Sequence, residues 1–342
     1  MKNNGDKNKN KGVCEEENRS FVYNRLGMYM FYFYIFYWDA FRTSEFCYLC
    51  EVNLVLIGIN EIERMRSSIV PLLFVSVGVL MSCRSTGKLI ISEENYLEAD
   101  RQLWKNYEQA GTAIVMQQRT HPELKDSLNN VLQQALERVQ ADNADLAVRY
   151  ATVPSALHRV YMVRGEVGKD RLKKVLARLP DSLKNNVYAG YIRRYIETKQ
   201  LVKGDKYVSF DCQTASGEKY DWGALANKNV LLLFDGLECM GQMNRDYLRN
   251  LSAKTDRCDL EILVYRKCSS LEELKKDQEM YPYCTLVSDF QIEGNPMNII
   301  YNSQATPTCF LIDRDGVIRE ISMGLDSDGF DRFLRADGCL KE

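Results

Sequence analysis

Two short apolar runs most constrain how this chain can fold. They are "VLLLF" at residues 230–234 and "LEILVY" at residues 260–265, and the two runs together contain one charged residue. A strand with one face in water alternates apolar and polar side chains, whereas a strand buried on both faces is apolar nearly throughout. We therefore expect two central strands of a sheet that helices cover on both faces.

The residues that follow these runs have the pattern of helices. One helix is expected from about 240 to 251, and "SSLEELKKDQEMY" at 269–281 predicts another, with Ser269 or Ser270 as its N-cap. A last helix is expected near residues 328–335. Strands joined through helices are typical of parallel pairing.

Two segments have the pattern of β-hairpins. Residues 207–222, "YVSFDCQTASGEKYDW", alternate in polarity and contain a Ser-Gly turn. In residues 308–321, "TCFLIDRDGVIREI", the pair Asp315-Gly316 suits a tight primed turn. Helices between parallel strands and a terminal hairpin together predict an α/β fold with a central mixed sheet, over residues 201–342.

Residues 84–200 have a helical pattern, and we expect an all-α domain that precedes the α/β domain. Ser92 is a good N-cap, because it is followed by two glutamates that favour the first helical turn. Apolar residues recur at helical spacing over 124–139, a separate helix is expected near 143–151, and Pro154 suits the first position of the next helix. No residues with an evident chemical role occur here, so spacing, dimerisation or partner contact are the expected roles.

Residues 65–83 have the pattern of an export signal, with a basic head, an apolar middle and a small residue before Cys83. The ending "LMSC" resembles the lipobox of bacterial lipoproteins, in which the cysteine is acylated and becomes the mature N-terminus. The resemblance implies a lipid anchor at Cys83, and the alternative is an uncleaved transmembrane helix. Either interpretation predicts a membrane-anchored protein of the cell envelope that faces the periplasm.

Residues 1–64 stand in the wrong place for a chain with such a signal, because an export signal belongs at the N-terminus. This segment opens with Lys and Asn and continues into the aromatic run "MYMFYFYIFYW". We interpret it as the product of a start codon assigned too early. The alternative is an additional membrane-associated segment.

Charge and composition argue against nucleic-acid binding and against a metal site. A net charge of −2 provides no electrostatic surface for nucleic acid. The chain has two histidines, His121 and His158, both in helical segments distant in sequence from the cysteines. Because a Cys/His zinc site needs ligands at short spacings, we expect no metal site, and we expect no cofactor.

Four segments, in order, resemble the thioredoxin-like fold. The resemblance is to membrane-tethered thiol–disulfide oxidoreductases of the TlpA type, within the AhpC/TSA redoxin superfamily. The segments are, in chain order, "GDKYVSFDCQTASGEKYDWGAL", "NVLLLFDGLECMGQMNRDYLRNL", "YNSQATPTCFLIDRDGVI" and the closing helix. The helical domain and the lipobox also resemble lipoproteins of this type from Bacteroidetes-like bacteria.

The resemblance implies the residues of a site. The family's Cys-x-x-Cys motif falls on Cys239 and Gln242, so the attacking cysteine is present and glutamine stands in place of the resolving one. The family's cis-proline falls on Pro307, which would present the backbone of Thr306 to an extended substrate. The partners implied are protein thiols or disulfides.

The expected reactivity of Cys239 depends on opposing charges. A helix N-terminus favours thiolate, the form that attacks a disulfide. Glu238 and Asp235 are acidic neighbours and oppose it. We therefore expect partial activation of Cys239.

Release of a mixed disulfide needs a second thiol, which is supplied either by an external molecule or by another cysteine of the chain. Cys309 lies two residues after Pro307 and is the internal candidate, although a buried core residue is the alternative. Cys268 and Cys284 are candidates for a structural bridge. The cysteines that follow Cys83 number seven, which leaves at least one free thiol if all bridges are internal: Cys212, Cys239, Cys258, Cys268, Cys284, Cys309 and Cys339.

Two functions remain open at this point. One is an atypical single-cysteine thiol–disulfide oxidoreductase of the cell envelope, and the other is a redox-inactive binding or scaffold lipoprotein that keeps the thioredoxin-like fold. A peroxidase of the peroxiredoxin class is excluded, because the proline and threonine that this class places before its cysteine fall on Leu232 and Gly236.

Overall fold

The computed structural model describes residues 90–257 and 259–340, and from Ile91 onward the described chain belongs to one compact unit. The expected export signal over 65–83, its Cys83 and the upstream segment 1–64 lie outside these residues. Within the described ranges, no helix has the length and apolar character needed to cross a membrane.

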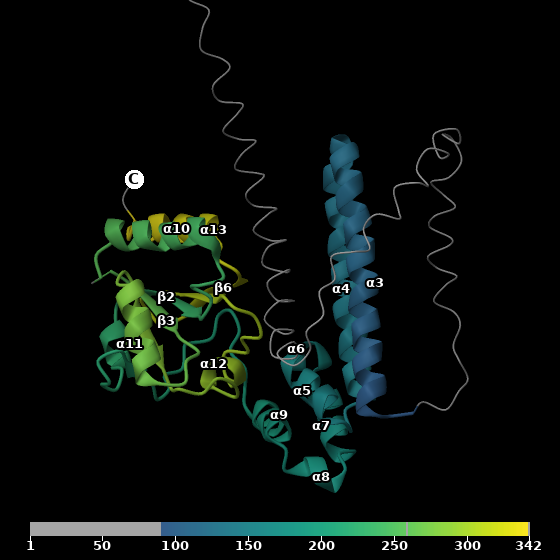
Figure 1. Ribbon diagram of the computed structural model, residues 1–342. Coiled ribbons are helices and arrows are strands. Elements are labelled where there is room, and N and C mark those ends of the chain that lie inside the picture. The colour runs from purple at the N-terminus through teal and green to yellow at the C-terminus, as the bar shows by residue number, and fades with distance from the viewer. Residues whose placement is uncertain (1–89, 258, 341–342) are drawn as a thin grey trace, which may run out of the picture. The chain divides into compact units, whose positions relative to one another are not determined.

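The described chain begins with two long helices, α3 (Glu93–Thr120) and α4 (Lys125–Arg149), joined through the short η4 (Pro122–Leu124) (Figure 1). The Ser92 hydroxyl caps α3 by accepting a hydrogen bond from the Asn95 amide, which confirms the predicted N-cap. The prediction of separate helices at 124–139 and 143–151 was wrong. A polar stretch interrupts the apolar stripe there, but Asn143 is buried and donates 2.5 Å to Asp100 of α3, so that α4 continues.

Short helices complete the helical region and share one core of aliphatic and tyrosine side chains. Pro154 occupies the first turn of the first of them, as predicted. This helix ends at Met162, and a separate turn of helix begins at Arg164. The helices are α5 (Pro154–Met162), α6 (Arg164–Val167), α7 (Lys169–Ala177), α8 (Asp181–Lys184) and α9 (Val187–Glu197).

A six-stranded mixed sheet follows, with the strand order β1-β4-β3-β2-β5-β6. The two apolar runs form its centre, pair in parallel, and are buried at every position, as predicted. β3 pairs in parallel with β4, whereas β5 is antiparallel to both β2 and β6. The strands are β1 (Gln213–Thr214), β2 (Asn229–Phe234), β3 (Leu260–Tyr265), β4 (Thr285–Ser288), β5 (Thr308–Ile312) and β6 (Ile318–Met323).

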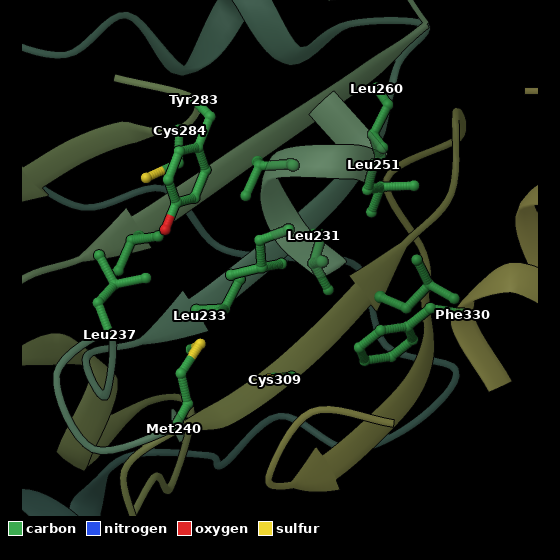
Figure 2. Packing of buried hydrophobic residues seen from close by; sticks show 14 of the residues in the cluster. Leu231, Leu233, Leu237, Met240, Leu251, Leu260, Tyr283, Cys284, Cys309 and Phe330 are labelled. Carbon is green, nitrogen blue, oxygen red and sulfur yellow. The ribbon is translucent and has the colours of Figure 1, made fainter. Parts of the chain in front are cut away.

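Helices cover both faces of this sheet. On one face, α10 (Gly241–Lys254), α11 (Leu271–Met280) and α13 (Ser327–Ala336) pack on a core that includes Leu231, Leu233 and Cys309 (Figure 2). The Ser270 hydroxyl caps α11. In Figure 1, α10 and α13 lie side by side, and Tyr247 of α10 donates 2.8 Å to Asp331 of α13.

The other face is covered by α12 (Pro296–Ile299), by η5 (Trp222–Leu225) and by an aromatic cluster around Phe310. Because alternate side chains of a strand point to opposite faces, an apolar run such as β2 contributes to both cores. A central mixed sheet flanked by helices and preceded by a helical region is the predicted thioredoxin-like architecture.

The two predicted hairpins form in modified ways. The turn at 214–218 is present, but only β1 is a strand, and Gln213 meets Lys219 in a single bridge. The β5–β6 turn was expected to be primed, which requires positive φ at both central residues. Only Gly316 has positive φ (77°), while the Asp313 carboxylate accepts hydrogen bonds from the amides of Asp315 and Val317, so that expectation was wrong.

Arg164 joins the helical region to the segment that leads into β5. This side chain is 1% exposed, and its guanidinium donates 2.7 Å to the main-chain oxygen of Asn298 and 3.0 Å to that of Ser303. Gln304 accepts a hydrogen bond of 3.0 Å from the Gly165 amide. The residues just before Thr306 are therefore held by α6.

Candidate functional site

Cys239 lies in the loop between β2 and α10. Asp235 and Gly236 both adopt positive φ (50° and 88°), which turns the chain sharply out of the sheet. The Cys239 amide donates 3.1 Å to the Gly236 oxygen. Because α10 begins at Gly241, Cys239 immediately precedes the helix, as the expected helix start near residue 240 implies.

The thiol of Cys239 faces the residues before β5. The Thr306–Pro307 bond is cis, as predicted. The Sγ atom of Cys239 lies 3.7 Å from the main-chain oxygen of Thr306 and 3.3 Å from that of Gly236. A Cβ atom added to Gly236 would lie 2.6 Å from the Pro307 nitrogen, so only glycine allows the loop to pack so closely on the proline. The structure thus places Cys239 beside Thr306, the residue that precedes Pro307.

The environment of Cys239 stabilises the neutral thiol. Burial raises its pKa above the usual range, and the negative charges of Asp235 and Glu238 act in the same direction. A hydrogen bond with the Thr306 side chain lowers the pKa but does not offset burial. The expected partial activation was therefore wrong, because desolvation and the two carboxylates outweigh the hydrogen bonds that favour thiolate.

Arg266 connects the carboxylates around this loop. It follows β3, and its guanidinium forms ion pairs with Asp235, with Glu238 (2.6 Å) and with Asp277 of α11 (2.6 Å). Arg266, Asp235 and Asp277 have side chains only 10–13% exposed, whereas that of Glu238 is 60% exposed. Arg245 of α10 holds the same loop from the other side, donating 3.2 Å to the oxygens of both Leu237 and Glu238.

Gln242 has polar partners on its own helix. Its side-chain nitrogen donates a hydrogen bond of 2.9 Å to the Asp246 carboxylate, and its side-chain oxygen accepts one of 3.0 Å from Arg245. It is exposed, at the second residue of α10. The position that a resolving cysteine would take is thus occupied by a side chain that stabilises the first turns of the helix.

The other thiols are in the core. Cys309 is 0% exposed, pairs in register with Leu233, and has its pKa raised by burial. This matches the core interpretation, whereas redox coupling between Cys309 and Cys239 stays a prediction. Cys268 and Cys284 are free thiols, so the bridge suggested for them is not formed in this structure. Of the six cysteines whose surroundings the structure describes, only Cys239 is not buried.

Arg266 and Arg245 were not identified from the sequence. The signal for Arg266 was present, because parallel neighbours such as β2 and β3 end at the same edge, and each is followed directly by a charged residue. Across residues 90–257 and 259–340, no three His, Cys, Asp or Glu side chains are grouped so as to hold a metal ion.

No protein-family model matches the chain, and no curated protein matches it. Among solved structures, it is similar to a thiol-disulfide oxidoreductase from Bacteroides fragilis, with 19% identity, a TM-score of 0.34, and coverage of 38% of this chain and 99% of that one. It is also similar to the thioredoxin domain of a thiol-disulfide oxidoreductase from Bacteroides vulgatus, with 18% identity, a TM-score of 0.33, and coverage of 39% of this chain and 99% of that one. A thiol peroxidase from Chromobacterium violaceum has 15% identity and a TM-score of 0.33, with coverage of 41% of this chain and 90% of that one. Likeness at this level assigns no reaction, which must be argued from the site itself.

Proposed function

We propose that this protein exchanges thiols and disulfides through the single cysteine Cys239, with other proteins as its partners. The observation that carries the proposal is that Cys239 alone among the described cysteines is not buried, and that its Sγ faces Thr306 beside Pro307. A partner disulfide can approach a half-buried sulfur, whereas it cannot approach thiols in the core such as Cys309.

The exchange has three steps. The Cys239 thiol loses its proton to solvent, and the thiolate attacks one sulfur of the partner's disulfide. A bond forms between Cys239 and that sulfur, the partner's S–S bond breaks, and the leaving thiolate takes up a proton. External thiols then resolve the mixed disulfide, because Gln242 provides no second thiol. One attacks the Cys239 sulfur, and the partner leaves with both of its sulfurs as thiols. A second attacks the disulfide now on Cys239, which frees Cys239 and joins the two external thiols in one disulfide. The partner disulfide gains two electrons, which the two external thiols lose.

The domain division and location belong to the same proposal. We propose an all-α domain over 84–200 and a thioredoxin-like domain over 201–342, with the chain held at the cell envelope, on its periplasmic side, by a lipid on Cys83. The pattern of residues 65–83 supports this placement. Metabolic labelling with a fatty acid should label the full-length chain and fail to label its Cys83→Ser variant.

Trapping tests the exchange. The full-length chain is incubated with a small disulfide over a range of pH, and the tryptic peptide 229–245, which contains Cys239 as its one cysteine, is followed by mass spectrometry. We expect the peptide to gain the mass of half the disulfide, and an added thiol to remove it. A peptide that stays unmodified while a denatured sample reacts would overturn the proposal.

A redox-inactive binding module is the second candidate, and one observation favours it. The carboxylates of Asp235 and Glu238 act with burial to keep Cys239 protonated, while Gln242 is bonded to Arg245 and Asp246. Such a site can present the thioredoxin-like surface without chemistry. The trapping experiment separates the two functions, because a binding module forms no mixed disulfide at neutral pH.

A further inference from the structure

We propose that Arg266 is the positioning residue of the Cys239 loop, holding Sγ against Thr306 by joining both ends of the turn to α11. This inference rests on the proposed exchange reaction and adds a residue to it. No part of the sequence motif around Cys239 includes Arg266, which lies on a different strand connection.

The sheet places Arg266 where it can do this. Phe234, the last residue of β2, is in register with Tyr265, the last residue of β3, so Asp235 and Arg266 leave the sheet side by side. Main-chain hydrogen bonds fix both, from the Asp235 amide to the Tyr265 oxygen and from the Arg266 amide to the Val287 oxygen, each 2.8 Å. The main chain of Arg266 is therefore fixed at the end of the central strands, next to Asp235.

Each ion pair of Arg266 restrains a different part of the site. Asp235 is the first residue of the turn, Glu238 immediately precedes Cys239, and Asp277 belongs to α11. A planar guanidinium with donors in a fixed fork sets the relative positions of its partners, which a flexible ammonium does not. Because Arg266 and two of its partners are nearly buried, water screens these pairs less than pairs on the surface.

Arg266 also compensates the two carboxylates that oppose ionisation of the thiol. The ionisable groups that face the loop are Asp235 and Glu238 within it, Asp277 and Tyr281 from the side of α11, and Arg245 from α10. Arg266 is the cation that pairs with both carboxylates of the loop. Its loss would leave them uncompensated beside Cys239, and the thiol would then ionise only at higher pH.

The chain offers a matched control in Arg314. Its guanidinium pairs with Asp259 (3.2 Å) and Asp337 (2.9 Å) and donates to the Asn227 oxygen, which ties together the segments entering β2 and β3. Arg314 thus resembles Arg266 in forming more than one ion pair, but it lies at the opposite end of β2 and β3, where these strands begin. Replacing it removes two ion pairs, which are more exposed than the pairs of Arg266 with Asp235 and Asp277, without touching the Cys239 loop.

The test measures the alkylation of Cys239 against pH in the full-length chain, together with the rate of mixed-disulfide formation, by means of peptide 229–245. Arg266→Gln should move the alkylation midpoint up by about one pH unit, which is about tenfold in the thiolate fraction at neutral pH. Arg314→Gln should leave the midpoint unchanged. An Arg266→Gln midpoint that is unchanged or lowered would overturn the proposal.

Arg266→Lys separates geometry from charge and serves if the glutamine variant does not fold. Lysine keeps the positive charge but cannot hold three carboxylates in one plane. We expect its midpoint to stay near that of the wild type, while mixed-disulfide formation slows severalfold. A lysine variant as fast as the wild type would contradict a positioning role.

If the wild type forms no mixed disulfide at any pH, the proposed exchange fails. The alkylation midpoints of the variants still decide whether Arg266 acts on Cys239.

Discussion

The Sγ atom of Cys239 lies 3.7 Å from the main-chain oxygen of Thr306, the residue whose bond to Pro307 is cis. The most accessible thiol of the described chain is therefore next to an irregular backbone segment, although the two are far apart in sequence. The surroundings keep this thiol protonated. The thiol proposed for the exchange is thus held in surroundings that oppose its ionisation, and the other cysteines of the described chain are buried.

Restoring a second cysteine should give internal turnover. We expect Gln242→Cys to form a disulfide between positions 239 and 242 and to raise disulfide-reductase activity about tenfold or more, because an intramolecular thiol replaces an external one. The measurement is turnover with a dithiol reductant, and mass analysis of peptide 229–245 identifies the bond. Met243→Cys, exposed and one position further, is the control and should not gain activity. An inactive Gln242→Cys variant would argue for the binding module.

Glu238→Gln should make Cys239 more reactive at neutral pH. The Glu238 carboxylate is one of the causes that raise the pKa of Cys239, so its removal lowers that pKa and moves the alkylation midpoint down by about half a unit. The effect is small because Glu238 is largely exposed. Glu272→Gln, an exposed glutamate of α11, is the control. A midpoint that rises instead would mean that the pair with Arg266 matters more than the charge of Glu238.

Gly236→Ala should disturb the loop more than its backbone angle alone explains. The added Cβ would meet Pro307 atoms at 2.6–2.7 Å, in addition to the strain of alanine at a φ of 88°. Gly168→Ala is matched for φ (77°) but meets nothing within 4 Å. We expect about 1–3 kcal/mol of destabilisation for Gly168→Ala, whose backbone (φ 77°, ψ 153°) lies in a region that essentially only glycine adopts. Gly236→Ala should lose about 1–3 kcal/mol more, and urea unfolding measures both. Equal losses would show that the loop can move away from Pro307.

Arg164→Met should weaken the hold of the helical region on the segment before β5. The substitution keeps most of the buried volume but removes the donors to Asn298 and Ser303, and we expect a loss of about 2 kcal/mol. Arg178 also donates to main-chain oxygens but is exposed, so Arg178→Met should cost less than about 0.5 kcal/mol. Urea unfolding measures both, and equal stabilities of the two variants would contradict the structural role of Arg164.

Stability should fall at alkaline pH. Burial raises the pKa of Cys212 and Cys284 to about 12 each, and it raises that of Cys309 as well. Such thiols lose their protons first in the unfolded chain, so their contribution is complete below the ordinary thiol pKa of about 8.5 and is lost as pH rises towards the folded value. Each group should cost about 1.4 kcal/mol per pH unit in that window.

Urea unfolding at pH 8 and pH 10 measures this slope, and Cys309→Ala should reduce it. The alanine variant is expected to be less stable at pH 8, because a buried side chain is shortened. Its stability should nevertheless change less between the two pH values than that of the wild type. An identical change in both proteins would mean that Cys309 does not remain protonated in the folded chain.

Local pattern was sufficient for the central strands and for several helix starts. The apolar runs of β2 and β3, the cap at Ser92 and the proline at the start of α5 could all be predicted, because burial on both faces and helix capping depend on residues adjacent in sequence. The places of Cys239 and Pro307 could be predicted too, from the resemblance of the segments that contain them.

Tertiary structure decided what depends on residues distant in sequence. The continuity of α4 depends on the bond from Asn143 to Asp100, and the protonation of Cys239 depends on its burial and on which carboxylates lie beside it. The partners of Arg266 follow from the register of β2 against β3. Sequence therefore determined the central strands and several helix starts, whereas the continuity of α4 and the reactivity of the thiol were set by contacts, desolvation and charges that only the folded chain brings together.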